Sequence, residues 1–302
     1  MEKTSYSSPG AVEAAIASAA QRATMANPNI PTHERIRREY FNRFLSRVFR
    51  NGSESDWVLA GGGALLSRLD SARSTTDVDL GTTKTGIEDA VGALRELASY
   101  DLGDFFRFRY RKQTSPLDIF APQHRAISRL SFEVFLGAQS KGMLRVDVAG
   151  GVSITSTPEL VSPAHSLNLP LLKSFPYLLY PVVDHIADKV CATLSSYNGH
   201  PSTREKDLVD LVVLAATQRI VGSDLWRALR AESELRGLGQ VMEFSIPSEW
   251  GSRYKAIASK TPGCHVAVTI KDARVLTSDF LNPALNGSSR GKTWSPDSLS
   301  WS

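Results

Sequence analysis

The 302-residue chain contains only two cysteines, Cys191 and Cys264, with no CxxC pair and no cysteine–histidine spacing typical of zinc ligands. This scarcity excludes a disulfide framework and a structural zinc site. No run of about 18 apolar residues occurs, which excludes a transmembrane helix. The alanine-rich stretch over residues 11–23 is interrupted by polar residues and follows no strongly basic segment, so we expect no secretory signal. We therefore expect a cytoplasmic, reduced protein without a membrane partner.

Extreme composition is also absent. The chain is 42% hydrophobic and 22% charged, with 21 glycines and 15 prolines. These proportions exclude disordered, collagen-like and low-complexity classes. The length corresponds to about two domains, and such a chain buries enough surface to fold without disulfide or metal staples.

The net charge is small, but it is unevenly distributed. Lysine and arginine number 35 against 31 acidic residues, a net of +4. Residues 22–50 carry seven arginines and two acids, and residues 105–145 carry eight basic residues and two acids, Asp118 and Glu133. Such blocks indicate contact with a polyanion, because cations that bind phosphates release counterions. A solvated charged face is the alternative interpretation.

Hydrophobic periodicity predicts helices and strands along most of the chain. Phe106, Phe108 and Tyr110 alternate with three arginines, as on a half-buried strand with a basic outer face. We expect a proline-rich surface connection over residues 163–181 and a poorly packed tail from residue 286. Expected helices cover residues 31–49 with Thr32 as N-cap, 64–69, 86–100, 184–197, 204–218 and 223–236 with Ser223 as cap, so the first half is expected to run strand, helix, strand, helix and three strands from residue 57. Expected strands cover residues 57–60, 77–80, 106–111, 130–136, 143–149 and 266–270.

Asp77 and Asp79 flank Val78 in one of the short expected strands. Residues i and i+2 of a strand share a face, so the two carboxylates project together. Neighbouring carboxylates raise each other's pKa unless a cation lies between them, and Mg²⁺ prefers such oxygen ligands. Taken alone, however, a DxD pattern is more commonly a surface turn or a strand end.

Two further features strengthen the hypothesis of a metal and phosphate site. Gly61, Gly62 and Gly63 stand between an apolar strand and a helix, where backbone amides and the helix N-terminus bind phosphate. A tight turn is the alternative. Asp147 lies between two valines of another expected strand, which places a charge toward a metal, an open cleft or solvent.

In the second half, charged residues of opposite sign are expected on two successive helices. Lys189 lies beside the apolar stripe of one helix, and Asp207 and Asp210 share a face of the next. One interpretation is a lysine that binds a triphosphate and is oriented by an aspartate. A helix–helix salt bridge is the other.

Taken in this order, the motifs resemble the nucleotidyltransferase fold of the DNA polymerase β type. More narrowly, they resemble the AbiEii/AbiGii toxin family, including the MenT toxins, from about Trp57 to Leu214. Gly63 stands where many members have Thr or Ser, and Thr76 stands where some have Lys. The resemblance is carried by Gly62-Gly63-Ala64-Leu65 with Arg68, by Arg73 to Asp79, by Asp147, by Ile186 to Val190 and by Arg204 to Leu211.

This resemblance implies an α+β fold with its active site in a cleft between two domains. Residues 1–160 would form a catalytic domain with a mixed sheet and N-terminal helices, and residues 161–302 a mainly helical domain. The implied metal ligands, for two Mg²⁺ ions, are Asp77, Asp79 and Asp147. The implied nucleotide-binding residues are Gly62, Gly63, Arg68 and Lys189, and Asp210 completes the catalytic set with Lys189 and the three metal ligands.

The resemblance also implies a reaction. A nucleoside monophosphate would pass from an NTP, with a pyrimidine base, to the 3′ end of a tRNA and block translation. A cognate antitoxin is the expected partner, and the expected RNA contacts are Arg38, Arg107, Arg109 and Arg111. Nucleotidyl transfer to a small molecule or a protein hydroxyl, and a non-catalytic nucleotide- or RNA-binding regulator, are the alternatives. A regulator would be expected to have lost one of the three acids, all of which are present.

Overall fold

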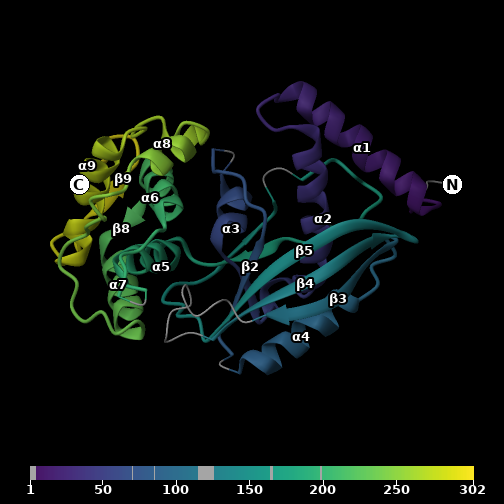
Figure 1. The fold of residues 1–302 in the computed structure, drawn as a ribbon, viewed down its shortest axis with the longest axis horizontal. Coiled ribbons are helices and arrows are strands. Elements are labelled where there is room, and N and C mark those ends of the chain that lie inside the picture. The colour runs from purple at the N-terminus through teal and green to yellow at the C-terminus, as the bar shows by residue number, and fades with distance from the viewer. Residues whose placement is uncertain (1–4, 70, 85, 115–125, 164–165, 198) are drawn as a thin grey trace.

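The computed structural model describes residues 5–69, 71–84, 86–114, 126–163, 166–197 and 199–302. Asp118 and Arg125 of the second basic block lie outside these residues. Figure 1 shows a large sheet with its helices on one side of the molecule and a mainly helical part on the other, with α3 and β2 between them. The expected mixed α+β architecture is confirmed.

The large sheet is mixed and has the order β3-β4-β5-β2-β1-β7-β6. Its central strand β2 runs parallel to β5 and antiparallel to β1, and β7 is parallel to β1. The expected order of strand, helix, strand, helix and three strands is confirmed. The strands are β1 (Trp57–Leu59), β2 (Val78–Thr82), β3 (Phe106–Thr114), β4 (Ile127–Leu136), β5 (Gln139–Gly150), β6 (Glu159–Val161) and β7 (Tyr177–Leu179).

Helices cover one face of strands β3 to β5. The ring of Phe44 on α2 lies 5.3 Å from that of Phe108 and 5.2 Å from that of Phe132, measured between centroids. Helix α4 packs beside α2, and α1 packs on the outer side of α2 (Figure 1). These helices are α1 (Pro9–Ala26), α2 (Thr32–Val48), α3 (Gly61–Arg68) and α4 (Ile87–Ser99), with a 3₁₀ turn at Gly52–Glu54.

The other face of β3 to β5 is open and basic. Phe106 and Phe108 are buried against the helices, whereas Arg107 and Arg109 are exposed on the opposite side. Because strand residues alternate between faces, the aromatic–arginine pattern predicts this arrangement, and the prediction is confirmed.

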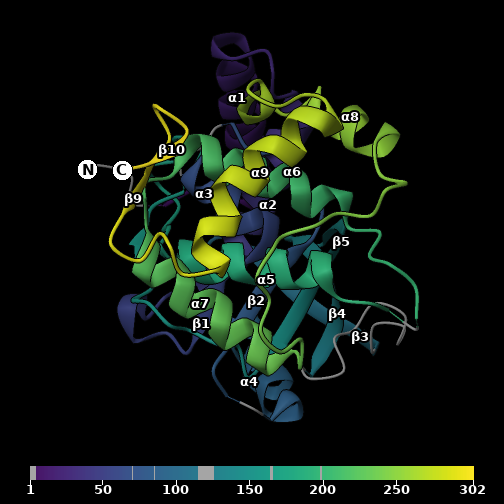
Figure 2. The same cartoon turned by 90° about the vertical axis from the view of Figure 1, so that its left-hand side faces the viewer.

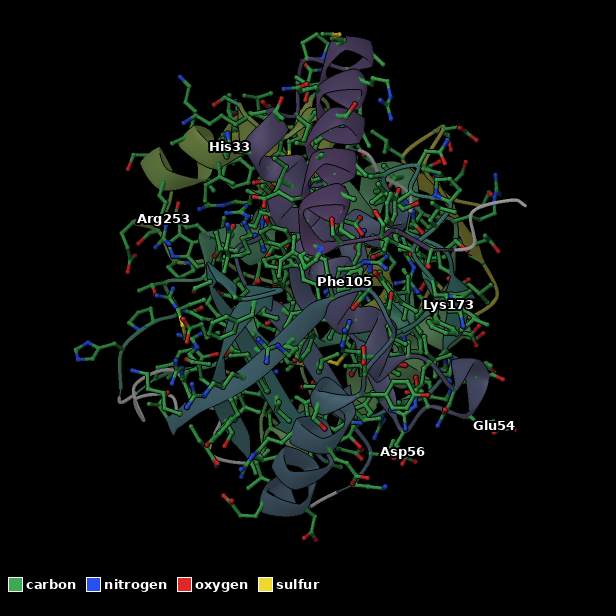
Figure 3. All side chains as sticks on the ribbon, turned by 90° about the vertical axis from the view of Figure 1, so that its right-hand side faces the viewer. His33, Glu54, Asp56, Phe105, Lys173 and Arg253 are labelled. Carbon is green, nitrogen blue, oxygen red and sulfur yellow. The ribbon has the colours of Figure 1, made fainter. Side chains whose placement is uncertain are left out.

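The first basic block forms no comparable surface. Arg35, Arg43 and Arg47 of α2 are buried, and Arg47 donates to both carboxylate oxygens of Asp104 at 2.7 and 3.1 Å. Lys173, which does not belong to this block, is by contrast exposed at the edge of the face shown in Figure 3. Three of the seven arginines of this block are therefore taken up by packing, and a polyanion contact of the others stays a prediction.

The second half of the chain is mainly helical and has its own hydrophobic core. Figure 2 views it face on, with α5 and α6 toward the sheet. Its elements are α5 (Val182–Leu194), α6 (Glu205–Thr217), α7 (Gly222–Leu235), α8 (Ser252–Ala258), α9 (Ile270–Leu285), a 3₁₀ turn at Pro262–Cys264, and a small sheet of β8 (Ile220–Val221), β9 (Thr293–Ser295) and β10 (Ser300–Trp301).

Several local expectations are wrong. The tail is packed rather than loose: Trp294 is fully buried, its ring lies 4.8 Å from that of Phe280, and its indole N–H donates to the Ala215 carbonyl at 2.7 Å. Residues 266–270 form no strand, because α9 begins at Ile270. Residues 163–181 are more than a surface connection, since they include the buried strand β7. The residues before α2 and α7 are Pro31 and Val221, so Thr32 and Ser223 are not N-caps.

The division into domains stays a prediction. The N-terminal sheet includes β7, which follows residue 160, and Leu65 and Ala72 pack in the second core rather than the first. Within the described part of the chain, no helix is long and apolar enough to cross a membrane.

Candidate functional site

Asp79 and Asp147 lie directly opposite each other on the parallel strands β2 and β5. The register thus joins two acids that are far apart in the sequence. Burial and the negative charge of Asp147 raise the pKa of Asp79 from its ordinary 3.8 to about 6, and Asp77 adds to the effect. Lys206 and Lys189 act in the opposite direction. Both other predicted metal acids therefore act on the charge of Asp79, an arrangement that a divalent cation would stabilise.

Asp77 precedes β2 by one residue, and its Oδ1 atom is buried without a hydrogen-bond partner among the residues that the structure describes. An orphaned carboxylate oxygen beside other carboxylates fits a hard divalent cation. In the conformation described, however, no three histidine, cysteine, aspartate or glutamate side chains among the described residues are arranged to hold a metal ion. The donor atoms fit Mg²⁺, and their present arrangement is incomplete.

Gly61 allows the carboxylate of Asp79 to approach the start of α3. Its φ of +54° is in the left-handed region, and a Cβ atom at this position would lie 2.0 Å from Oδ2 of Asp79. Only glycine fits both conditions. Gly62 and Gly63 instead face Thr75 and Leu59, which a Cβ atom would meet at 2.9 and 3.2 Å. The sequence interpretation chose the second and third glycines of the run and missed the first, whose position immediately after a strand was the available signal.

Arg129 holds the carboxylate of Asp147, and the sequence interpretation missed it. Its Nε donates to Oδ1 at 2.7 Å and its Nη2 to Oδ2 at 2.6 Å. The two residues face each other across β4 and β5. Hydrogen bonding to Asp147 raises the pKa of Arg129, so the guanidinium stays charged.

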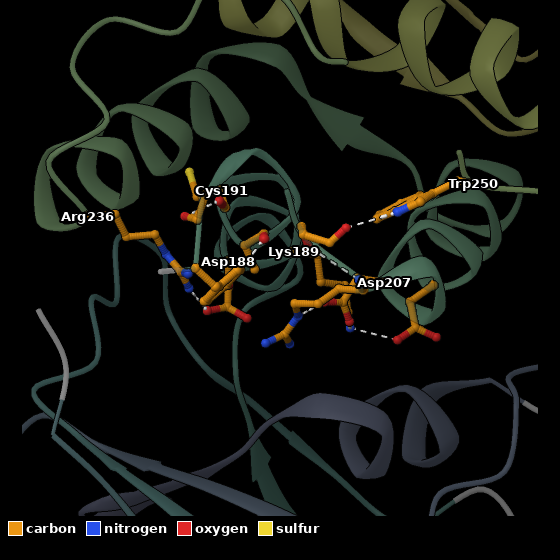
Figure 4. A network of polar contacts seen from close by, with 12 residues as sticks. Asp188, Lys189, Cys191, Asp207, Arg236 and Trp250 are labelled. Carbon is orange, nitrogen blue, oxygen red and sulfur yellow. Dashed lines mark hydrogen bonds and ion pairs between the residues drawn. The ribbon is translucent and has the colours of Figure 1, made fainter. Parts of the chain in front are cut away.

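A second charged cluster lies in the helical half (Figure 4). The Nζ atom of Lys189 donates to Asp210 at 2.7 Å and to Asp207 at 3.2 Å. Arg73, from the loop before β2, donates to both oxygens of Asp210 at 2.9 Å, and Arg204 pairs with Asp207. Three cations thus surround two buried carboxylates.

These neighbours control the charge states of the cluster. Burial alone would raise the pKa of Asp210, but Lys189 and Arg73 hold it below its ordinary value. Burial would likewise lower the pKa of Lys189, but Asp210 and Asp207 raise it. Both sides therefore stay ionised. The predicted Lys189 and Asp210 are together, and the salt-bridge interpretation describes their contact.

Lys206 is a further residue that the sequence interpretation missed. It is exposed on α6, and its charge acts on Asp79. The charge of exposed Lys206 therefore acts on the acids of the sheet, as does that of the buried Lys189. Arg204 and Asp207, on either side of Lys206, belong to the motif recognised in the sequence. A single lysine on a helix gives no signal of its own.

Arg68 is almost fully enclosed at the end of α3. Its side chain is 6% exposed and donates to Glu159 at 3.1 Å, whereas Nε and Nη1 are buried and have no partner in the described part of the chain. His185 on α5 is also buried, and neither ring nitrogen forms a hydrogen bond with a described residue. The role of Arg68 in nucleotide binding stays a prediction.

The predicted RNA contacts divide into two groups. Arg107, Arg109 and Arg111 lie on β3, where Arg107 donates to the Gly137 carbonyl at 2.8 Å and Arg111 pairs with Glu133. Arg38 lies elsewhere: it donates to Glu34 at 3.1 Å and to Ser74 at 3.3 Å. With Asp77 it lines a small, largely apolar pocket between α2 and α3.

Comparisons with known proteins agree with the resemblance of the motifs. The sequence profile described as "Nucleotidyl transferase AbiEii toxin, Type IV TA system" matches residues 43–273. No curated relative matches the chain. A candidate nucleotidyltransferase from H. pylori is 13% identical, with 83% of this chain and 96% of that chain covered and a TM-score of 0.40. The structure of JHP933 from Helicobacter pylori is 13% identical, with 86% and 96% covered and a TM-score of 0.41.

Proposed function

The chain belongs to the AbiEii nucleotidyltransferase toxin family of type IV toxin–antitoxin systems, and we propose that this enzyme transfers a nucleoside monophosphate from an NTP to the 3′ end of a tRNA. A pyrimidine nucleotide is the proposed donor, and Mg²⁺ the proposed cofactor. The single observation that carries the proposal is the register of Asp79 and Asp147, with Asp77 beside them. The family implies an antitoxin partner, and the proposed site of action is the cytoplasm.

In this proposal Asp77, Asp79 and Asp147 hold the divalent cation. The support is the orphaned oxygen of Asp77, the raised pKa of Asp79 and the space that Gly61 leaves for its carboxylate. A bound divalent cation supplies charge neutralisation on the phosphates and a lower pKa for the attacking hydroxyl. The chain's own task is to keep the carboxylates close together and ionised.

The nucleotide would lie with its phosphates toward the start of α3. There, the amides of the glycine turn and the positive end of the helix favour an anion. Lys206, exposed on α6, is the proposed contact of the leaving pyrophosphate. Lys189 is committed to Asp207 and Asp210, so it acts through its charge and by holding α5 to α6. Arg68, with two buried donors unused, completes the proposed nucleotide contacts.

The acceptor would lie on the open face of β3 to β5. Three strand steps of about 4.8 Å each separate β3 from β2 across the sheet. The register sets Arg109 opposite Glu133 and Met143, four residues along β5 from Asp147, so a bound RNA would extend along the strands from these arginines to the acids. Contacts from Arg107, Arg109 and Arg111 to phosphates would place an RNA without reading its sequence. Arg38 lies beside the loop that leads into β2. It is a further proposed RNA contact, apart from the arginines of β3.

Nucleotides added at the 3′ end would prevent aminoacylation and stop translation. A cationic small molecule would favour an acidic acceptor face, whereas the open face carries exposed arginines, so RNA is the better candidate.

The test is to incubate the purified protein and Mg²⁺ with each α-³²P-labelled NTP in turn and total cellular RNA. The expected result is one labelled band of tRNA size with one of the pyrimidine NTPs. Label in a protein or a small molecule, with none in RNA, would contradict the proposed acceptor.

A further inference from the structure

The row of residues across β2, β5 and β4 joins the proposed metal acids to an arginine. Asp79 faces Asp147, and Asp147 faces Arg129. The guanidinium uses both oxygens of Asp147, at 2.7 and 2.6 Å. In this conformation Asp147 has its strongest acceptor directions occupied by a cation of the chain itself.

Arg129 occupies both oxygens of Asp147, whereas Asp77 keeps a buried oxygen without a partner among the described residues. Among the described residues no three such ligands are arranged around one point. Asp147 is the acid whose carboxylate is bound by another side chain, that of Arg129.

The pair is also exposed enough to open. The side chain of Arg129 is 44% exposed and that of Asp147 is 24% exposed. By contrast, Arg47 and Asp104 form a similar pair with 0% and 2% exposure. Solvent and ions compete effectively for exposed ion pairs, whereas separating a buried pair leaves uncompensated charges. An ion from solvent can therefore compete with Arg129 for the carboxylate of Asp147.

We propose that Arg129 is an exchangeable counter-ion of Asp147: it holds this carboxylate while no metal is bound and releases it when a divalent cation binds. Arg129 is a positioning residue, because it acts through Asp147. The inference rests on the proposed role of Asp147 as a metal ligand. Its consequence is that the ion and the guanidinium compete for the same two oxygens, so Arg129 sets the metal concentration at which the enzyme becomes competent.

The first test titrates Mn²⁺ alone, without nucleotide, into the full-length protein by calorimetry at physiological ionic strength. We expect Arg129→Gln to bind Mn²⁺ about 3- to 10-fold more tightly than the wild type, because the competitor is lost. Arg129→Lys, which keeps the charge but loses the two-point contact, should fall between them. The matched control is Arg145→Gln, which removes an exposed arginine from the same strand face two residues before Asp147 and should change affinity less than about twofold.

The second test observes the guanidinium directly. In ¹H–¹⁵N spectra of the wild type, the Nε–H signal that disappears in Arg129→Gln belongs to Arg129. Adding Mg²⁺ should shift or broaden this signal, because its acceptor is withdrawn, while the signal of Arg47 in its buried pair stays in place.

The outcomes separate the inference from the proposed function. Unchanged or weaker Mn²⁺ binding in Arg129→Gln, or an equal gain in Arg145→Gln, would overturn the counter-ion role while leaving the enzyme's metal site intact. A wild type that binds no Mn²⁺ would overturn the metal assignment and the inference together. Unfolding midpoints of the variants, measured alongside, show that each compared protein is folded.

Discussion

Arg73 and Asp210 join the loop before β2 to helix α6 through two hydrogen bonds of 2.9 Å. A second link is the N–H of Gly263, which donates to the Ser71 carbonyl at 3.0 Å. The loop leads directly to Asp77 and so connects the helical half to the acids of the sheet. Because Asp210 is buried beneath Lys189 and Arg73, we interpret it as a positioning residue rather than a metal ligand.

This interpretation predicts a large loss of stability in Asp210→Asn. Removing one charge leaves Lys189 and Arg73 buried with half their counter-charge, and broken buried pairs cost about 3–5 kcal/mol. Urea denaturation measures the loss. The control is Asp224→Asn, which breaks an exposed pair with Arg227 and should cost less than about 1 kcal/mol. Equal, small losses in both variants would contradict the positioning role.

Gly61→Ala should damage the acid site. The new Cβ would lie 2.0 Å from Oδ2 of Asp79 in a left-handed backbone, so Asp79 must move, and the strained backbone costs about 1–2 kcal/mol. We expect weaker Mn²⁺ binding and lower nucleotidyl transfer. Gly92→Ala is the matched control: it lies within α4 with nothing near its Cβ position and should gain about 0.5–1 kcal/mol. Unaltered metal binding in Gly61→Ala would show that Asp79 does not depend on this approach.

His185 predicts a specific loss of stability in acid. Burial and the charge of Lys189 lower its pKa from 6.5 to about 3. Between these values the unfolded chain binds a proton and the folded protein does not, so stability falls as the pH falls, by up to about 1.4 kcal/mol per unit. His185→Leu removes this contribution. Asp79, whose raised pKa acts in the opposite direction between about 6 and 4, is common to both proteins and cancels in their difference.

The measurement is the urea midpoint of the wild type and of His185→Leu from pH 7 to pH 4.5. The stability of the variant relative to the wild type should increase steadily as the pH decreases. A constant difference over this range would mean that His185 is protonated in the folded protein or reaches solvent.

The open face of β3 predicts how RNA binding depends on salt. Replacing Arg107 and Arg109 with Gln removes two proposed phosphate contacts, so the slope of log K against log salt should decrease by about 1.5 in magnitude. Fluorescence anisotropy with labelled tRNA measures it. Replacing Arg227 and Arg230 of α7, both exposed in the helical half, is the charge-matched control. The same slope change in both double variants would indicate general attraction rather than a binding face.

Much of the sheet could be predicted because its signals are local. The alternation along residues 106–111 follows from the two faces of a strand, and the order of elements from Trp57 to Gly150 could be read from periodicity. The spacing of Asp77 and Asp79 also predicts that their carboxylates share one face of a strand. The buried tail could not be predicted: Trp294 lies in a stretch rich in glycine and serine, and its contacts with Phe280, Trp301 and Ala215 explain its burial.

The partners of the candidate site were harder to predict, because they depend on strand register and on packing between distant segments. Arg129 is one of several basic residues in its block, and only the pairing of β4 with β5 distinguishes it. The sequence predicts Arg47 as a surface charge, whereas in the structure it is buried and paired with Asp104, which is distant in the sequence. Periodicity contains no information about such pairs.

The central claim is tested most directly by transfer of label from an α-³²P-labelled NTP to purified tRNA in the presence of Mg²⁺. The wild type should label the 3′ end, and Asp79→Asn and Asp147→Asn should each reduce the rate by more than about 100-fold. Asp79→Asn should unfold no more easily than the wild type, because it relieves repulsion from Asp147, and Asp224→Asn should keep full activity. Labelling by Asp79→Asn at the wild-type rate would contradict the account.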